Sequence, residues 1–310
     1  MDSEDSFPSI SPGMARERFL VKDEAWEQRF RPNFNQFIIA PFEFARPVIK
    51  LPVPPGRTGN HALFLLTGGQ VGLTVGHQAY RLSAQQLAVV PAGQIFSITA
   101  IQADTTGFMC FFSNDLLLSA INEANFDFLK LTNNPLTELS TQQTAFLTSL
   151  LNRLVIEYTE SGASRTDILR PYLLAVLSEI NRAYAGTQAV VKTDAGDRLV
   201  QGFMTLLDER IRQESQVTTY ADRLHVSPNH LNKVVKSRTG QSPSVWIDER
   251  RVLEAKVLLF QSTLTIGQIA AELGFTDQSN FGKLFRKYAG VSPAQFRKMI
   301  ESDQFLPGIA

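Results

Sequence analysis

The stretch that decides the fold is IGQIAAELGFTDQSNFGKLFRKYAGVSP, residues 266–293. Its pattern occurs twice, because key residues of an upstream segment recur here at offsets of 49 or 50 positions. The pairs are Ala221 and Ala270, Leu224 and Leu273, Leu231 and Phe281, Val235 and Phe285, Gly240 and Gly290, Pro243 and Pro293, and Trp246 and Phe296. A solenoid needs about three or more stacked copies to bury a common core. Two copies therefore indicate a duplicated compact unit.

The first copy predicts two short helices joined by a tight turn. Thr218 is placed to cap a helix that ends at Leu224, and residues 225–227 form the connection. Ser227-Pro228 opens the second helix as its N-cap and first helical residue, and Gly240 stops it.

The second copy repeats this design. Thr265 caps a helix over Ile266–Leu273, residues 274–277 form the turn, and Gln278–Ala289 form the second helix. In both second helices apolar residues recur at i, i+3 and i+4, so one face belongs to a core. Two short helices joined by a tight turn form a helix-turn-helix, whose second helix fits the major groove of DNA.

The outward faces of the two second helices carry amides, hydroxyls and cations. Asn and Gln can form two hydrogen bonds to adenine, and Lys can donate to guanine acceptors. Hydroxyls and backbone amides at helix starts can bind phosphate. The alternative is that these are solvated helix faces, but the same polarity on two matched helices favours DNA binding.

Between the two copies, residues Ser242–Gln261 predict one amphipathic helix. About 20 residues at 1.5 Å each give roughly 30 Å, close to the roughly 34 Å of one turn of DNA. A rigid helix of this length could place two recognition helices in adjacent major grooves. Trp246 and Phe296 are expected to be core residues of their units.

At this point the chain resembles the AraC/XylS family of bacterial transcription regulators over roughly residues 197–298. The resemblance is carried by Gly240-Gln241-Ser242-Pro243, Trp246-Ile247, Arg251, Ala255, Leu258-Leu259, residues 266–275 and residues 279–293.

The resemblance implies double-stranded promoter or operator DNA as partner, with RNA polymerase as a further partner. Whether the regulator is an activator or a repressor depends on where its site lies. The base-contacting positions are then Asn229, Asn232, Lys233, Gln278, Ser279, Asn280 and Lys283. The phosphate-contacting positions are Thr218, Ser227, Lys236, Thr265, Arg286 and Lys287. Family members often carry Arg where this chain has Lys233 and Lys283, and Lys lacks the bidentate fork of Arg.

Charge is balanced overall but not along the chain. Residues 1–194 hold 15 basic and 18 acidic residues, and residues 195–310 hold 15 and 12. DNA affinity is therefore expected from a localised patch. The single cysteine, Cys110, excludes an internal disulfide and suits a buried strand. The acidic start favours no signal peptide, and no apolar run approaches a membrane span, so we expect a cytoplasmic protein.

The first two thirds of the chain predict a different architecture. Residues 1–33 are polar and proline-dotted, which is typical of a loosely packed arm, and residues 34–113 favour a jelly roll or small barrel. Gly76-His77-Gln78 marks a hairpin. The expected strands are Phe37–Phe44, Val48–Val53, Ala62–Leu66, Val71–Val75, Ala79–Leu82, Leu87–Val90, Ile95–Ile101 and Phe108–Ser113.

The segment Leu82–Phe96 resembles the second sequence motif of cupins. The first motif should supply two His and a Glu, yet only His61 stands near that place, and a metal site needs three or four converging ligands. We therefore expect a cupin-like barrel with no metal and no cofactor, and a structural or pocket-rim role for His61. The candidates for an effector pocket are Arg46, Arg57, His61, Tyr80 and Arg81.

Residues 114–185 predict a helical region with long amphipathic helices over Thr141–Thr159 and Asp167–Tyr184. Such a hairpin either pairs two chains into a homodimer or caps the barrel, and we favour the homodimer. Residues 186–196 are expected to form the linker and residues 197–300 the DNA-binding domain.

The sequence thus predicts an α+β protein: a cupin-like barrel or jelly roll with a helical hairpin, then an all-α domain with two helix-turn-helix units joined by a long helix. We expect a sequence-specific DNA-binding regulator, not an enzyme, controlled by a small-molecule effector in the barrel. The alternatives are a ligand-independent regulator whose barrel only mediates dimerisation, and a cupin enzyme.

Overall fold

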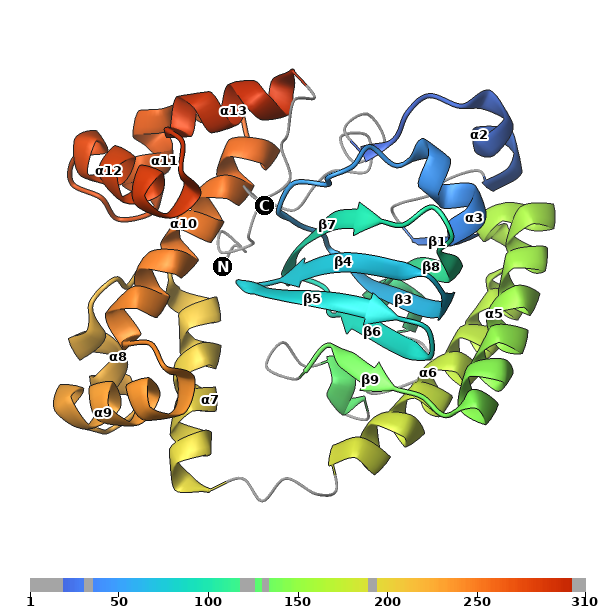
Figure 1. The fold of residues 1–310 in the computed structure, drawn as a ribbon, viewed down its shortest axis with the longest axis horizontal. Helices are drawn as coiled ribbons and strands as arrows, with labels where there is room; N and C mark the ends of the chain where they lie inside the picture. Colours follow the sequence, from blue (N-terminus) through green and yellow to red (C-terminus); the bar gives the residue numbers. More distant parts are fainter. Residues whose placement is uncertain (1–18, 31–35, 118–125, 130–133, 189–193, 303–310) are drawn as a thin grey trace. The chain divides into compact units, whose positions relative to one another are not determined.

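The computed structural model describes residues 19–30, 36–117, 126–129, 134–188 and 194–302 (Figure 1). These residues form two compact units, one on each side of residues 189–193. The first unit is built around antiparallel strands and the second is helical. The predicted α+β class, with a β-rich domain before an all-helical one, is confirmed.

Two antiparallel sheets make up the centre of the first unit. One has the strand order β1-β8-β3-β6-β9 and the other β2-β7-β4-β5. The predicted hairpin at Gly76 and His77 joins β4 to β5. The strands are β1 Phe37–Pro41, β2 Gly56–Arg57, β3 Asn60–Gly68, β4 Gln70–Val75, β5 Gln78–Ser83, β6 Gln86–Val90, β7 Ile95–Ile101, β8 Thr106–Ser113 and β9 Leu136–Glu138.

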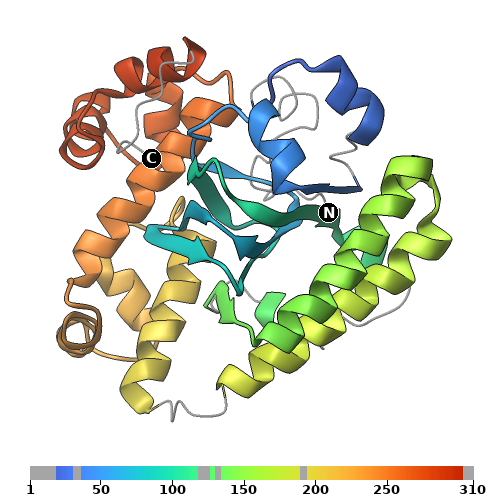
Figure 2. The same ribbon diagram turned by 45° about the vertical axis from the view of Figure 1, so that its right-hand side comes forward.

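The five-stranded sheet is buried on both faces because side chains alternate along each strand. Leu63 and Leu65 of β3 belong to the core shared with the long helices α5 (Thr141–Ser161) and α6 (Thr166–Gln188), whereas Phe64 belongs to the core between the two sheets. Both views show α5 and α6 running side by side across that sheet (Figures 1 and 2).

The remaining helical elements of the first unit are short. They are α2 Glu24–Phe30, α3 Phe42–Ala45, η1 Arg46–Val48, α4 Asn114–Leu117, η3 Asp127–Leu129 and η4 Gly162–Ser164. The second unit consists of α7 Ala195–Arg210, α8 Val217–Arg223, α9 Pro228–Thr239, α10 Pro243–Gln261, α11 Ile266–Glu272, α12 Gln278–Ala289 and α13 Pro293–Glu301. The two predicted amphipathic helices of the first unit are confirmed as α5 and α6, slightly extended at their ends.

Two predicted strands differ in the structure. The strand expected over Phe37–Phe44 ends at Pro41, and the strand expected over Val48–Val53 is wrong. Phe42 and Ala45 are both buried at helical spacing, so the chain turns into α3. The prolines at 47, 52, 54 and 55 offer no N–H for a ladder, which confines the next strand to the short β2.

The predicted arm over residues 1–33 also differs where it is described. Residues 24–30 form α2, whose Trp26 and Phe30 lie four residues apart and are buried in the core of the first unit. A pair of aromatic residues at this spacing makes an apolar helix face, which composition alone did not reveal. Residues 1–18 and 31–33 lie outside the described residues.

The predicted linker over residues 186–196 is shortened from both ends. The helix α6 continues to Gln188, and Asp194 caps α7 by accepting a hydrogen bond from the Asp197 N–H at 2.9 Å. The helical region predicted over residues 114–185 also contains the strand β9, which pairs with β6. A three-residue strand has too few positions to show alternation.

Candidate nucleic-acid interface

The first helix-turn-helix consists of α8 and α9, packed on α7. Ser227 caps α9, because its Oγ accepts a hydrogen bond from the His230 N–H at 3.2 Å, and Pro228 is the first helical residue. The helix ends at Gly240, whose φ of 79° lies in the left-handed region that favours glycine. The predicted bounds of this recognition helix are confirmed.

A closed core holds these helices together. Leu231 and Val235 of α9 are fully buried against Phe203 of α7 and Tyr220 of α8, and the rings of Phe203 and Tyr220 meet edge to face with centroids 5.6 Å apart. Ile247 of α10 completes the cluster. Because α9 shares this core with the long helix, its orientation is fixed relative to α10.

The expected cap of α8 is wrong. The N-cap is Gln216, and Thr218 lies inside the first turn with its hydroxyl 3.5 Å from the Gln216 side-chain oxygen. The helix starts earlier because Val217 packs against the core of this motif, and that packing outweighs the capping preference of a threonine.

The second helix-turn-helix repeats the design in α11 and α12. Thr265 and Gln268 form a capping box at the start of α11, as the predicted cap required. Asp277 caps α12 by accepting the Ser279 N–H at 2.8 Å. Backbone hydrogen bonding by Ser279 lowers the pKa of Asp277, so its carboxylate stays charged at the positive end of the helix dipole.

Three aromatic rings form the core of the second motif. Phe285 meets Phe281 and Phe296 edge to face, with centroids 5.8 and 5.5 Å apart, and all three rings are buried. Phe296 is therefore the core residue that the repeat predicted. Its counterpart Trp246 is only partly buried, and its indole N–H donates to Thr239 Oγ1 at 3.0 Å, so this residue joins α10 to the end of α9.

The turns of the two motifs share one backbone conformation but not one residue type. His225 has φ 55° in the first turn, and Gly274 has φ 72° at the matched position of the second. An L-residue in this left-handed backbone region costs about 1–2 kcal/mol of stability, whereas glycine adopts it without that cost.

We expect Gly274→Ala to lower the free energy of unfolding by about 1–2 kcal/mol for this reason. His225→Gly should be neutral or stabilising, because relief of strain offsets the greater freedom of glycine in the unfolded chain. Denaturant unfolding of both variants measures the difference, and equal effects of the two changes would contradict it.

The predicted connecting helix over Ser242–Gln261 is confirmed as α10, which Ser242 precedes as N-cap. Both views show one helix-turn-helix near each end of α10, with α9 and α12 on the same side of it (Figures 1 and 2). Its 19 residues span roughly 28 Å at 1.5 Å each, a length close to the roughly 34 Å of one DNA turn.

Buried charges attach the first motif to this rod. Arg250 of α10 contacts Asp208 of α7 at 2.9 Å and Glu254 at 3.8 Å, and Arg212 contacts Glu254 at 3.5 Å. Arg250 is 4% exposed and Glu254 is 0% exposed. Charges this deeply buried need their partners, so the network holds the segment 208–212 at one place on α10.

An arginine of α10 attaches the second motif to this helix. The Arg251 guanidinium lies 3.5 Å from the centroid of the Phe275 ring, and one of its terminal nitrogens donates to the Leu273 carbonyl at 2.8 Å. Both contacts lie at the turn between α11 and α12. Burial lowers the pKa of Arg251, but a guanidinium remains charged at neutral pH.

The base-contacting residues predicted on α9 differ in the exposure and the internal hydrogen bonds of their side chains. Asn229 and Lys233 are exposed. Asn232 is half-buried, and its amide donates to the Pro228 carbonyl one turn earlier at 3.0 Å. An adenine contact through both amide atoms would require Asn232 to give up this bond.

The base-contacting residues predicted on α12 are all exposed: Gln278, Ser279, Asn280 and Lys283. They lie on the face of α12 opposite the buried Phe281 and Phe285. The helix therefore presents amide, hydroxyl and ammonium groups together on its solvent side.

The predicted phosphate-contacting residues are likewise exposed: Thr218, Ser227, Lys236, Thr265, Arg286 and Lys287. Two of the hydroxyls already serve as caps. The Ser227 Oγ accepts the His230 N–H but keeps its own proton to donate, whereas the Thr265 hydroxyl donates to the Gln268 side chain at 3.0 Å. Ser227 is thus the better placed of the two for a phosphate.

One candidate was missed from the sequence. His230 is exposed on α9 at the position matched to Asn280 in the 50-residue repeat. Applying the offset to each polar residue of α12 would have found it. An imidazole can donate to or accept from base edges, so His230 belongs to the same face as Asn229 and Lys233.

None of the candidate effector residues of the first unit lines the apolar cavity that α2 helps to form. The Arg57 Nε donates to the Gly93 carbonyl at 2.7 Å, and the Arg46 Nε donates to the Ile101 carbonyl at 3.3 Å. Tyr80 is partly buried, which raises its pKa, and the adjacent Arg81 is exposed. Arg57 and Arg46 are thus bonded to backbone carbonyls and Tyr80 packs against the core between the two sheets, and the role of these residues as an effector site stays a prediction.

His61 has the structural role that the sequence favoured. Its Nδ1 accepts the Ala92 N–H at 3.0 Å, which leaves Nε2 to carry the proton and donate to the Asn114 side-chain oxygen. Its ring stacks on Phe112 with centroids 5.1 Å apart. The histidine thereby fastens the start of β3 to neighbouring segments.

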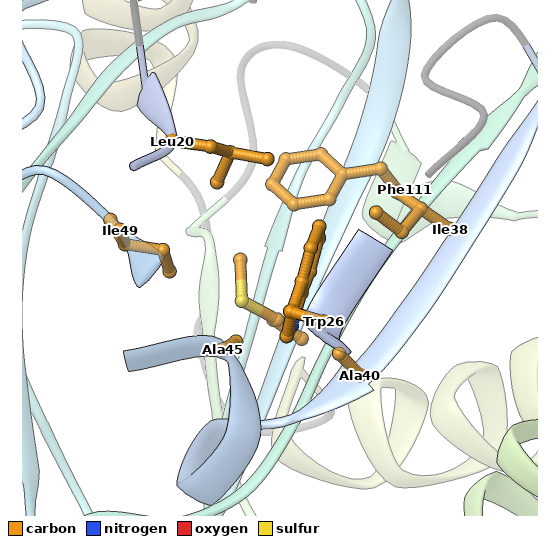
Figure 3. A pocket seen from close by; sticks show the side chains of 8 residues that line it. Leu20, Trp26, Ile38, Ala40, Ala45, Ile49 and Phe111 are labelled. Atoms are coloured by element: carbon orange, nitrogen blue, oxygen red, sulfur yellow. The ribbon is translucent and has the colours of Figure 1, made fainter. Parts of the chain in front are cut away.

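The cavity lies where α2 packs on β1 and β8 (Figure 3). It has a volume of about 30 Å³ and an entirely apolar lining of Leu20, Trp26, Ile38, Ala40, Ala45, Ile49, Met109 and Phe111. Figure 3 shows Trp26 in the middle of the group, with Phe111 above it and Ala40 and Ala45 below. The sequence could not predict it, because it depends on the packing of a segment expected to be loose.

Three further features of the described residues concern the cysteine, metal ligands and membrane-spanning helices. Cys110 is buried in β8, which raises the pKa of its thiol, as expected of a strand residue. Within the described ranges, no group of three or more His, Cys, Asp or Glu side chains is arranged to hold a metal ion. None of the described helices is long and apolar enough to cross a membrane.

Residues 220–299 match the family described as a helix-turn-helix domain. This span runs from α8 into α13 and so contains both motifs and the connecting helix. The regulatory protein PocR of Salmonella typhimurium is 26% identical over 113 residues, which are 36% of this chain and 37% of PocR. The arabinose operon regulatory protein of Escherichia coli is 28% identical over 103 residues, 29% of this chain and 35% of its own.

The chain therefore matches only 35–37% of the length of these two curated relatives. Among solved structures, ToxT from Vibrio cholerae with a bound unsaturated fatty acid is similar over 87% of this chain and 97% of its own. Its sequence identity is 16% and the TM-score is 0.41.

Proposed function

We propose that the protein is a transcriptional regulator of the AraC/XylS type that recognises specific promoter or operator sequences, since its second unit matches a helix-turn-helix domain and is similar in sequence to the arabinose operon regulatory protein. The observation that supports this most is the pair of matched polar faces on α9 and α12, fixed to one rod by buried contacts. Asn229, His230 and Lys233 would contact one major groove and Gln278, Ser279, Asn280 and Lys283 the next.

We expect Asn280→Ala to weaken binding to a selected site by about 1–3 kcal/mol and to relax the base preference at one position, because an amide contact to a base is lost. Sites are selected from random DNA with the full chain, and affinities are measured by gel shift at fixed salt. Lys236→Ala is the matched comparison, since a lost phosphate contact weakens all sequences alike.

If Asn280→Ala binds the selected site with unchanged affinity and base preference, α12 does not belong to the recognition surface. If instead the unmodified protein selects no sequence, the regulator proposal itself fails. The two outcomes are distinct because the second needs no variant.

We further propose that a small apolar effector controls the protein through the first unit. The cavity beneath α2 is lined only by apolar groups, which suits an uncharged aliphatic or aromatic molecule. A volume of about 30 Å³ holds little more than a water molecule, so an effector would enter by displacing α2 and Trp26.

A thermal-shift screen of apolar and sugar ligands tests this site. A ligand at 100 times its dissociation constant stabilises the unit that it binds by about 2.7 kcal/mol. Ala45→Val narrows the cavity and should weaken the shift, whereas Arg81→Ala, on an exposed strand position, should leave it unchanged. A shift that Ala45→Val does not change would place the effector elsewhere, and no shift with any ligand would favour a ligand-independent regulator.

The helical hairpin supports a twofold dimer. Phe146 and Ile156 of α5 are 50% and 46% exposed, and a self-complementary apolar patch is what a twofold interface requires. Sedimentation equilibrium should find a dimer that Phe146→Glu dissociates, and a monomeric unmodified protein would contradict this assembly. RNA polymerase is the further partner that we propose for an activator of this kind.

We favour a regulator over a cupin enzyme. His61 is the one histidine that the sequence places near a cupin metal motif, and both of its ring nitrogens are engaged within the protein. An imidazole held in this way cannot also offer a lone pair to a metal.

A further inference from the structure

The recognition helix α12 carries a glycine in its interior, and no described neighbour accounts for it. Gly282 lies between Phe281 and Lys283, within the α-helix. A Cβ built at Gly282 would meet no atom within 4 Å. Glycine in a helix interior is less stable than alanine, because it loses more conformational freedom on folding. The free protein therefore gives up stability at this position without any packing in return.

Other helical glycines of the second unit do have a reason in their surroundings. A Cβ at Gly202 would lie 3.0 Å from the Leu224 Cδ2, and one at Gly267 would lie 3.1 Å from the Gln278 side-chain oxygen. A Cβ at Gly196 would lie 3.3 Å from the Arg238 guanidinium. Gly282 differs from these because the space beside it is open.

The position of Gly282 suggests what fills that space. It precedes Lys283 by one residue and lies four residues after Gln278 and four before Arg286, on the half-exposed flank of the helix. In the 50-residue repeat it matches Asn232 of α9. Residues in the N-terminal half of a recognition helix contact base edges, whereas more distant positions contact the backbone of DNA.

We propose that Gly282 determines specificity by its missing side chain, which lets α12 approach the edge of a base pair closely enough that a Cβ would collide with it. This inference rests on the proposed function, since it assumes that α12 enters the major groove. The two motifs then differ at this position: α9 carries Asn232, whose amide is bonded to the Pro228 carbonyl, whereas α12 has no side chain there and its backbone can lie next to the base.

The test compares Gly282→Ala with the unmodified full chain on a selected site and on a panel of sites with one substituted base pair each. We expect a melting temperature equal to or above that of the unmodified protein, because the added methyl meets nothing in the free state. We also expect a loss of affinity of about 5- to 150-fold for the selected site, the range of one unfavourable base contact, with a changed base preference at one or two adjacent positions.

Gly202→Ala is the matched control, because it adds the same methyl group in the same unit but against Leu224. It should leave both the affinity for the selected site and the base preference unchanged. Unaltered affinity and preference for Gly282→Ala would overturn the proposal, as would an equal loss on every sequence, since that marks a contact to the sugar-phosphate backbone. A lowered melting temperature would overturn it too, by showing that the space is not open. If the unmodified protein selects no site, the proposed function and this inference both fail.

Discussion

Replacing Phe285 with alanine is expected to lower the free energy of unfolding of the second unit by about 3–5 kcal/mol. Phe285 is fully buried and contacts both other rings of the second motif. Its removal leaves a cavity at the centre of a small core that a shorter side chain cannot refill. Since domains are stable by only about 5–15 kcal/mol, this change should leave α11 and α12 largely unformed.

Trp246 provides the measurement, because it lies in the second unit and the other tryptophan, Trp26, lies in the first. Urea unfolding followed by Trp246 fluorescence in a Trp26→Phe background isolates the second unit. Lys298→Ala is the control in the same unit, because Lys298 is exposed on α13 and its loss should change stability little. A loss below about 1 kcal/mol for Phe285→Ala would show that the three rings do not form this core.

Glu254→Ala should be about as damaging, with a loss of about 3–5 kcal/mol. The carboxylate is fully buried and contacts both Arg250 and Arg212. Without it Arg250 keeps its contact with Asp208 but Arg212 loses its contact with Glu254, and the buried positive charge is less well balanced. The consequence goes beyond stability, because this network sets the angle of α7 on α10 and therefore the placement of the first recognition helix.

The same fluorescence assay measures the loss, and DNA binding by the folded fraction reports the placement. Arg238→Gln is the matched control in the same unit, since its ion pair with Asp194 is exposed and should contribute little. If Glu254→Ala and Arg238→Gln cost the same small amount, the buried network does not hold the first motif on the rod.

Local signals explain why the second unit was predictable in detail. The residues that begin or end α9, α11 and α12 act within the helix that they cap. They are Ser227-Pro228 and Gly240 for α9, Thr265 for α11 and Gly290 for α12, so their positions alone set these helix ends. The exception is Thr218, where packing of Val217 moved the start of α8. Capping preferences are worth only about 1 kcal/mol, so tertiary contacts can override them.

The features that were not predicted all depend on contacts between distant segments. Glu254 and Arg250 are polar residues in a helix that the sequence presents as amphipathic, and their partners lie elsewhere, Asp208 in α7 and Arg212 in the turn that follows α7. The cavity depends on the packing of α2 against β1. The helical turn at α3 was not predicted, because it lies in a segment with several prolines. Except for Asn232, the exposure of the proposed base-contacting residues on α9 and α12 was predictable from the sequence, because it follows from the helical spacing of the buried residues on the opposite face.

In the proposed regulator, α10 holds two recognition helices so that they enter successive major grooves on one side of the DNA. Hydroxyl-radical and methylation footprinting of the full chain on a selected site tests it most directly. We predict two sets of protected major-groove positions about 10 base pairs apart on one face, of which Asn280→Ala weakens one and leaves the other. A single protected groove, or protection of every sequence alike, would contradict the account.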